Sequence, residues 1–195
     1  MKINTNEVDL IIKNTIGIPL EYREQFFQIE HETFHKTYKR CPKTLVDFDK
    51  RYSGRSLILA VCLIKNEVIG QRTFEIIDDD LAQSMFMVVE KNYRSNKLSK
   101  LICSVSAEYF KWLNIKYIAS WTHIDITAAR IMSKYVPFIS EGDVLNDEEL
   151  MILRKIEHYE KKDVGYFGIT RRVKDYYTMI DNNQTGDAYF WVHKL

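Results

Sequence analysis

A chain of 195 residues, 46% of them hydrophobic, is long enough to bury the core of one domain. Its formal net charge of +1 excludes a global electrostatic field that would recruit nucleic acid or a membrane surface. No apolar run approaches the roughly eighteen residues of a membrane span, and the N-terminus lacks the apolar region of a secretion signal, so we expect a cytoplasmic protein.

The first half of the chain predicts a strand, two helices and a meander of three strands. Tyr22, Phe26, Ile29 and Thr33 recur at helical spacing, and Pro42 separates this helix from the next. A branched apolar run then predicts a strand buried on both faces, followed by an alternating hairpin partner. The expected ranges are strand 8–12, helices 20–39 and 43–52, and strands 56–64, 68–77 and 83–89.

The second half predicts a strong helix over residues 97–112 and a mixture of helices and strands after it. In that helix one apolar stripe joins Leu98, Leu101, Ile102, Val105, Tyr109 and Trp112. Asp125 or Thr127 is suited to cap a later helix that ends near Tyr135. The other expected ranges are strand 116–121, an amphipathic helix 146–162, and strands 164–173 and 187–195. This order predicts an α/β (α+β mixed) fold with a mixed, mostly antiparallel sheet flanked by helices.

The three cysteines, Cys41, Cys62 and Cys103, are odd in number and scattered. Cys62 lies in an apolar run and Cys103 in a helical pattern, where free cysteines behave as small core residues. A reducing compartment fits this set better than a disulfide framework does.

The stretch "HETFH", residues 31–35, matches the zinc-protease pattern H-E-x-x-H. A catalytic zinc needs a third protein ligand, and the first glutamate after Glu32 is Glu67, inside the predicted hairpin. The charged neighbours Glu30 and Lys36 indicate a solvated helix. We therefore expect His31 and His35 on an exposed or groove-lining face, with no metal site.

The segment "MFMVVEKNYRSNKLSKLI", residues 85–102, carries the clearest chemistry. A hydrophobic strand ends at Val89, a short polar turn follows, and a helix begins within a few residues. The free N–H groups and positive dipole end of a helix N-terminus form a site for phosphate or pyrophosphate. Cationic and hydroxyl side chains follow the turn, from Arg94 to Ser99.

Together with its neighbours, this segment resembles the GNAT superfamily of N-acetyltransferases. The coenzyme A loop of that family reads V-x-P-x-Y-R-G-x-G-x-G/A, and residues 89–99 read "VEKNYRSNKLS", in which Ser95 and Lys97 replace two glycines. The upstream order of two helices and a strand hairpin also matches. The resemblance covers residues 8–140 and implies a single GNAT-like domain, with an insertion at about 145–185 before the last strand. It implies that the donor is bound by Met87, Val89, Arg94, Ser95, Asn96, Lys97, Leu98 and Ser99.

A second family pattern, N-x-x-A-x-x-L-Y-x-K-x-G-F, resembles "ITAARIMSKYVPF", residues 126–138. Ser133 takes the place of the proton-donating tyrosine, and Tyr135 lies two residues beyond. As candidates for the base, Glu75 stands on the strand next to the loop-bearing strand, and His123 ends the following one. The catalytic candidates are therefore Tyr135, Ser133, Glu75 and His123.

The resemblance implies transfer of an acetyl or other acyl group from a coenzyme A thioester to a small-molecule or protein amine, with acetyl-CoA as the default donor and without a metal. Two alternatives stay open. The donor can be a long-chain acyl group on acyl carrier protein, because the apolar Met85, Phe86 and Met87 suit a wider tunnel. The domain can also be a non-catalytic binding module, because loop glycines are missing. The acceptor and the oligomeric state, including a homodimer, are left open.

Overall fold

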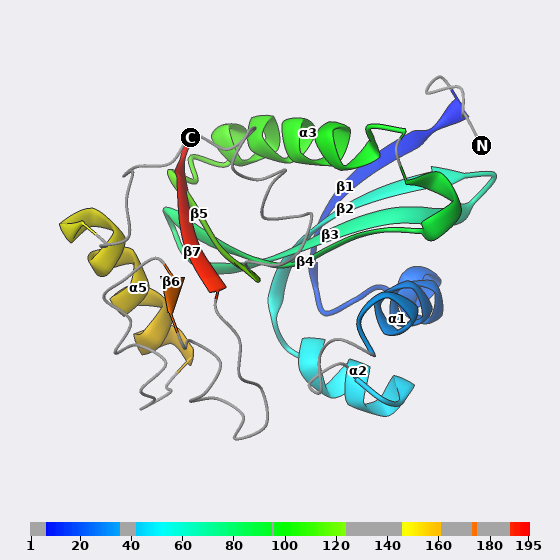
Figure 1. The fold of residues 1–195 in the computed structure, drawn as a ribbon, viewed down its shortest axis with the longest axis horizontal. Coiled ribbons are helices and arrows are strands. Elements are labelled where there is room, and N and C mark those ends of the chain that lie inside the picture. Colours follow the sequence, from blue (N-terminus) through cyan, green and yellow to red (C-terminus); the bar gives the residue numbers. More distant parts are fainter. Residues whose placement is uncertain (1–6, 36–41, 95, 124–145, 161–172, 175–187) are drawn as a thin grey trace. The chain divides into compact units, whose positions relative to one another are not determined.

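A computed structural model describes residues 7–35, 42–94, 96–123, 146–160, 173–174 and 188–195 (Figure 1). The chain forms two compact units. The first comprises residues 1–76 and 84–113, and the second comprises residues 77–83 and 114–195. Within the described residues, no helix is long and apolar enough to cross a membrane.

Four strands form the sheet of the first unit in the order β1-β2-β3-β4. Antiparallel pairing joins β1 to β2 and β2 to β3. The β2–β3 turn consists of Lys65 and Asn66, both with positive φ (51° and 66°), which is the conformation of the tight hairpin turns that match the twist of strands. The strands are β1 (Asp9–Ile16), β2 (Ser56–Ile64), β3 (Glu67–Asp78) and β4 (Leu81–Val89).

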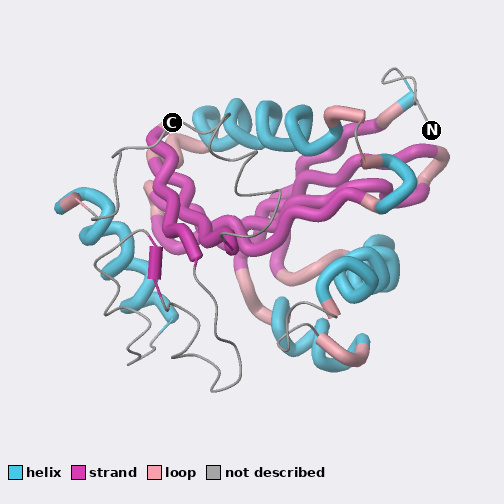
Figure 2. The backbone as a smooth tube through the Cα atoms, in the orientation of Figure 1, coloured by secondary structure: helices cyan, strands magenta, loops and turns pink. Residues whose placement is uncertain are grey.

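Helices cover both faces of this sheet (Figure 2). On one face lie α1 (Leu20–Phe34) and α2 (Leu45–Tyr52), and on the other lies α3 (Leu98–Trp112). The apolar cluster under α1 and α2 is built around Phe26, Phe48 and Tyr52, all at most 1% exposed. A second cluster under α3 contains Ala60, Cys62, Ile69, Leu98 and Ile102.

Side chains along β3 alternate between these two faces. Gln71 Nε2 donates to Phe26 O in α1 at 3.5 Å, whereas Arg72 Nη1 donates to Cys103 Sγ in α3 at 3.0 Å. Because successive residues of a strand point to opposite faces, Thr73 and Glu75 share the α1/α2 face with Gln71.

The alternation breaks in β4 at Met85 and Phe86. Both residues pack against the cluster under α1 and α2, although they are neighbours in the chain. Met87, in contrast, lies on the α3 face, where Cys103 Sγ donates to its Sδ at 3.7 Å. Two consecutive side chains on one face are typical of a β-bulge, which offsets backbone groups from the regular ladder and recurs next to active sites.

The second unit contains β5 (Tyr117–His123), α5 (Asp147–Glu160), β6 (Val173–Lys174) and β7 (Ala188–Lys194). Its strands are ordered β5-β7-β6, with antiparallel pairing throughout. A capping box begins α5, since Glu149 N donates to Asn146 Oδ1 at 2.8 Å and Asn146 N donates to Glu149 Oε2 at 3.1 Å.

The predicted fold class is confirmed: helices flank a mostly antiparallel sheet. The predicted stripe of α3 needs a correction, because Trp112 is 74% exposed and the buried residues are Leu98, Ile102, Ser106 and Phe110. Cys62 is a buried free thiol whose pKa is raised to about 12 by burial. The expected helix ending near Tyr135 lies outside the described residues, and the single domain with an insertion stays a prediction.

Candidate functional site

The turn between β4 and α3 is held in shape by its own polar side chains. It contains a short helix, η2 (Lys91–Tyr93). Glu90 caps this helix, because its side chain accepts a hydrogen bond from Asn92 N at 3.0 Å. Arg94 folds back onto the strand, and its Nε donates to Val89 O at 2.9 Å. Arg94 Nη2 also lies 3.4 Å from Thr33 Oγ1 in α1. The arginine thus braces the turn.

Lys97 begins α3 in the left-handed conformation, with φ 61° and ψ 14°. Glycine adopts this conformation without strain, whereas for another residue the left-handed conformation is less favourable by about 1–2 kcal/mol of free energy. The lysine therefore takes the backbone shape that the GNAT loop pattern assigns to glycine, while adding a cationic side chain.

The N-terminus of α3 has no capping bond from the side chain of Lys97. The first hydrogen bond of the helix runs from Leu101 N to Lys97 O at 3.0 Å. N–H groups of the first turn, including those of Leu98 and Ser99, therefore have no partner inside the helix. Such an end attracts anions, because its N–H groups and the helix dipole both favour negative charge.

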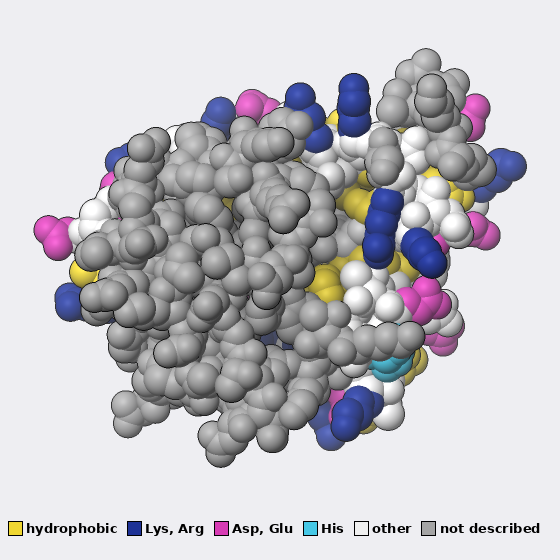
Figure 3. All heavy atoms as spheres, viewed as in Figure 1, with side chains coloured by type: hydrophobic (Ala, Val, Ile, Leu, Met, Phe, Trp, Pro, Cys, Tyr) yellow, Lys and Arg dark blue, Asp and Glu magenta, His cyan; other side chains and the backbone are white. Residues whose placement is uncertain are grey.

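Basic side chains surround this helix end. Lys91, Arg94, Lys97 and Lys100 are all exposed. In the space-filling view, Lys and Arg side chains lie over the region where Figure 1 draws the start of α3 and the preceding turn (Figure 3). Leu98, the first residue of α3, is 2% exposed and packs in the apolar cluster between α3 and the sheet. This combination suits a polyanionic group of the size of a pyrophosphate.

The residues predicted to bind the donor fall on one continuous stretch of the first unit. Met87 and Val89 lie at the end of β4, Arg94, Asn96 and Lys97 lie in the turn, and Leu98 and Ser99 begin α3. Ser95 lies outside the described residues. What sequence alone did not show is that Arg94 spans from the turn to α1.

The predicted catalytic residues are less fully described. Glu75 is 1% exposed and forms an ion pair with Arg55, so it is not the solvated strand residue that its sequence position suggests. His123 ends β5, but its side chain lies outside the described part of the protein. Ser133 and Tyr135 also lie outside it. Their roles stay predictions.

The two histidines of "HETFH" interact with each other and with backbone oxygens. Their rings stack with centroids 4.7 Å apart and an interplanar angle of 11°. Nδ1 of His31 lies 3.0 Å from Pro42 O, and Nδ1 of His35 lies 2.6 Å from His31 O. Among the described residues, no group of three His, Cys, Asp or Glu side chains is arranged to hold a metal ion.

Replacing the exposed His35 by Ala should change the free energy of unfolding by no more than about 0.5 kcal/mol, as for an ordinary surface substitution. Elemental analysis of the wild type should find no stoichiometric zinc. Tight zinc that disappears in His35→Ala would contradict this expectation.

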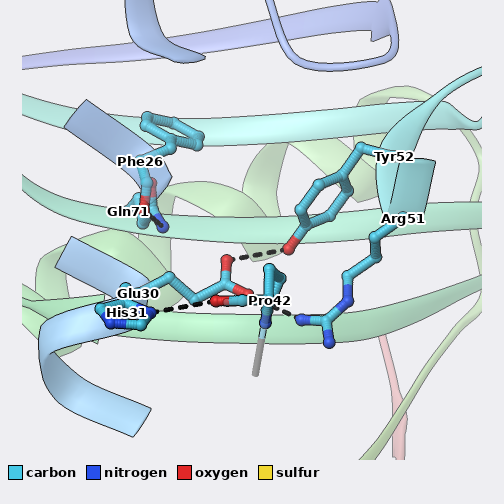
Figure 4. A network of polar contacts seen from close by, with 7 residues as sticks. All are labelled: Phe26, Glu30, His31, Pro42, Arg51, Tyr52 and Gln71. Carbon is cyan, nitrogen blue, oxygen red and sulfur yellow. Dashed lines mark hydrogen bonds and ion pairs between the residues drawn. The ribbon is translucent and has the colours of Figure 1, made fainter. Parts of the chain in front are cut away.

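A buried carboxylate on α1 was missed by the sequence prediction, which took Glu30 as a sign of a solvated helix. Glu30 is 1% exposed. Arg51 Nη1 donates to its Oε1 at 2.9 Å and Tyr52 OH to its Oε2 at 3.0 Å, both from α2 (Figure 4). The spacing i, i+4, i+8 places Glu30 on the stripe of Tyr22 and Phe26, and this was the available signal.

Burial sets the protonation of this group. It raises the pKa of Glu30 from 4.5 to about 7, against the opposing effects of Arg51 and Tyr52. Burial also raises the pKa of Tyr52 well above its usual value of 10.0. Tyr52 therefore stays a proton donor at neutral pH, whereas Glu30 exchanges its proton there.

A cavity of about 660 Å³ lies elsewhere, in the second unit. Its lining includes Ile77, Leu150 and Lys155, and Lys155 is already neutralised by Asp78 and Asp80 at 3.0 and 2.7 Å. None of the residues predicted for the site lines it. We therefore place the candidate site at the loop and at Glu30, and not at this cavity.

The arrangement of strands and helices defines the fold class. The chain has the fold of the GNAT superfamily of acetyltransferases, as many solved structures of that family match it. Comparison of the sequence with protein-family models finds no match, and no curated protein matches it.

Three of the similar structures show the range of the likeness. A GNAT family acetyltransferase from Elizabethkingia anophelis with acetyl-CoA bound is 12% identical, with a TM-score of 0.55 over 97% of this chain and 99% of that one. The ribosomal-protein-S18-alanine N-acetyltransferase of Escherichia coli is 10% identical, with a TM-score of 0.60 over 95% and 94%. An aminoglycoside acetyltransferase from an uncultured soil metagenomic sample, in complex with sisomicin, is 13% identical, with a TM-score of 0.54 over 72% and 94%.

Proposed function

We propose that this protein is an N-acyltransferase that moves an acetyl group, or another acyl group, from a coenzyme A thioester to an amine. The observation that carries the proposal is the helix end at Lys97, which combines a left-handed backbone, a first turn without a capping bond from the Lys97 side chain, and exposed cations. The fold supports it, and one protein of the same fold holds acetyl-CoA.

In this proposal the first-turn N–H groups of α3 bind the pyrophosphate, and Lys97 adds charge at the same place. Leu98 and Ile102, at most 2% exposed, keep the helix end fixed against the sheet. A β-bulge in β4 at Met85 and Phe86 would leave an N–H group outside the regular ladder, and such a group is suited to polarise a thioester carbonyl. The chain thus mainly positions and polarises the reactants.

For proton transfer, the sequence predicts residues on other elements. Glu75 and His123 are the predicted bases, and Ser133 or Tyr135 the predicted acid. A serine hydroxyl is a weak acid, so Tyr135 is the better candidate of the last two. The acceptor is left open between small-molecule and protein amines: the similar structures include an enzyme for a ribosomal-protein alanine and one that binds sisomicin.

Two alternatives are separated by direct measurements. Release of free thiol from acetyl-CoA, long-chain acyl-CoA and acyl carrier protein compares the donors. Calorimetry with coenzyme A, combined with absence of amine-dependent thiol release, would identify a binding module. The left-handed Lys97 supports binding of coenzyme A, because it adopts a conformation that favours glycine at a position where the loop pattern has a glycine.

Replacing Lys97 by Glu should weaken coenzyme A binding at least tenfold at low salt, because it puts a negative charge beside the phosphates. Titration calorimetry measures the affinity, and Lys111→Glu, at the other end of α3, is the matched charge reversal. The control should bind as the wild type does. Equal affinities of all three proteins would rule out this helix end as the pyrophosphate site.

A further inference from the structure

Hydrogen-bond acceptors without donors lie on the α1/α2 face of β3. Gln71 and Thr73 are 0% and 1% exposed. Gln71 Oε1 and Thr73 Oγ1 have no hydrogen-bond partner among the described residues. Buried polar atoms of native proteins are nearly always paired. Two such atoms, on residues that are i and i+2 of one strand, therefore indicate a place for a donor that the described residues do not supply.

Gln71 also contacts α1, the helix that carries the buried carboxylate. Gln71 Nε2 donates to Phe26 O, one helical turn before Glu30, and Figure 4 draws Gln71 together with Glu30 and its partners. The guanidinium of Arg51, which binds Glu30, also lies 5.1 Å from the centre of the Phe86 ring. The network is therefore connected to β4 at its irregular point, on the face opposite α3.

The chemistry of these atoms selects one class of ligand. A carboxylate, an amide oxygen and a hydroxyl oxygen accept hydrogen bonds, and an alkylammonium ion supplies three N–H donors and a positive charge. Arg51 and Tyr52, both of which donate to the carboxylate, fix its orientation. On the same face, β3 carries the uncharged Gln71 and Thr73 together with Glu75, which is paired with Arg55, and β4 carries the apolar Met85 and Phe86.

We propose that Glu30 is the general base of the acceptor site and removes the proton from a primary ammonium ion held by Gln71 and Thr73. This inference rests on the proposed acyl transfer and assigns its acceptor end. The loop at Lys97 and this network lie toward opposite faces of the sheet of the first unit, so the proposal requires the thioester and the amine to meet beside β4.

The proton and electron balance is simple. The ammonium ion gives one proton to the Glu30 carboxylate and becomes a neutral amine. The amine nitrogen attacks the acyl carbon, the carbon–sulfur bond breaks, and the thiolate leaves. The second proton lost by the nitrogen goes to the thiolate or to solvent, and Glu30 returns its own proton to solvent. Since its carboxyl pKa is about 7, both transfers are accessible near neutral pH.

A purely structural role for Glu30 is the competing explanation. In that case its ion pair with Arg51 only joins α1 to α2. A second ion pair, between Arg23 and Asp49, joins the same two helices. Asp49→Asn therefore serves as a matched control, because it loosens the same helix contact away from Gln71 and Thr73.

The experiment compares two small nucleophiles with acetyl-CoA as donor and thiol release as the signal. Methylamine is an ammonium ion near neutral pH and needs a base, whereas hydroxylamine is uncharged there and does not. Glu30→Gln should lower the methylamine rate at least a hundredfold and the hydroxylamine rate less than threefold, with unchanged coenzyme A affinity. Asp49→Asn should keep both rates within threefold. If Glu30→Gln does not fold, Glu30→Asp should lower the methylamine rate at least tenfold with the same selectivity.

Each other outcome overturns the assignment. Equal loss with both nucleophiles, or loss of coenzyme A affinity, would make Glu30 a structural residue and leave acyl transfer standing. Full methylamine activity in Glu30→Gln would also leave acyl transfer standing, and a selective loss in Glu75→Gln would move the base to Glu75. A wild type that accelerates neither nucleophile would overturn the acyl transfer itself, and the assignment of Glu30 with it.

Discussion

Raising the pH from 5 to 8 should lower the free energy of unfolding of the wild type by about 2.5 kcal/mol more than that of Glu30→Gln. The pKa of Glu30 is raised from 4.5 to about 7 in the folded protein, chiefly by burial. The folded state therefore holds this proton more tightly than the unfolded chain does. The resulting stability is complete below pH 4.5 and is lost as the pH rises through 7. Urea unfolding at several pH values measures both proteins.

The pH range of this stability change distinguishes Glu30 from the carboxylates whose pKa values are lowered. The pKa values of Glu21 and Asp49 are lowered by hydrogen bonds from Lys13 and Arg23, so their contribution is lost only at pH values below their usual pKa. Asp49→Asn should therefore follow the wild type between pH 5 and 8. Parallel stability curves for the wild type and Glu30→Gln would show that the carboxyl group is not held protonated by burial.

The strands of the first unit could be predicted because their signals are local. Branched apolar residues fill β2, and the run ends at Lys65 and Asn66, which form the two-residue turn. A turn of that length forces the next segment to pair as a hairpin. Nothing beyond neighbouring residues is needed for this inference.

The face of a helix is harder to predict, because several stripes of α3 contain apolar residues. The predicted stripe ended at Trp112, which is exposed, whereas the buried one passes through Ser106 and Phe110. Ser106 tolerates burial because its hydroxyl donates to Ile102 O at 2.6 Å within the helix. A polar residue on the buried face thus hid the true stripe.

The loop at Lys97 and the network of Glu30 also differ in how far they could be predicted from local sequence. The strand, turn and helix around Lys97 could be predicted from local signals, and anion binding by a helix N-terminus would require only these three elements in sequence. The network of Glu30 was not, because its members come from α1, α2 and β3 and are joined only by the fold. A glutamate in a charged segment resembles a solvated residue until its partners are known.

Replacing Phe110 by Ala should lower the free energy of unfolding by about 3–5 kcal/mol, the largest effect of a single substitution expected here. Phe110 is 0% exposed, and its ring meets that of Phe74 edge to face, with centroids 4.7 Å apart. The substitution removes this aromatic contact and leaves a cavity under the C-terminal half of α3. Denaturant unfolding measures the loss.

The same variant separates stability from function when it is compared with Ile102→Ala. Ile102 packs the N-terminal half of α3 closely against β3: a Cβ atom added at Gly70 would lie only 3.3 Å from Ile102 Cδ1. Ile102→Ala should therefore lower the free energy of unfolding by about 2–5 kcal/mol. The donor loop leads directly into this half of the helix, so a shift of the helix end should displace the proposed phosphate site. Ile102→Ala should therefore weaken coenzyme A binding at least tenfold at a temperature where both variants are folded. Phe110→Ala should bind within threefold of the wild type. Equal losses in the two variants would mean that overall stability, and not the position of the helix end, sets the affinity.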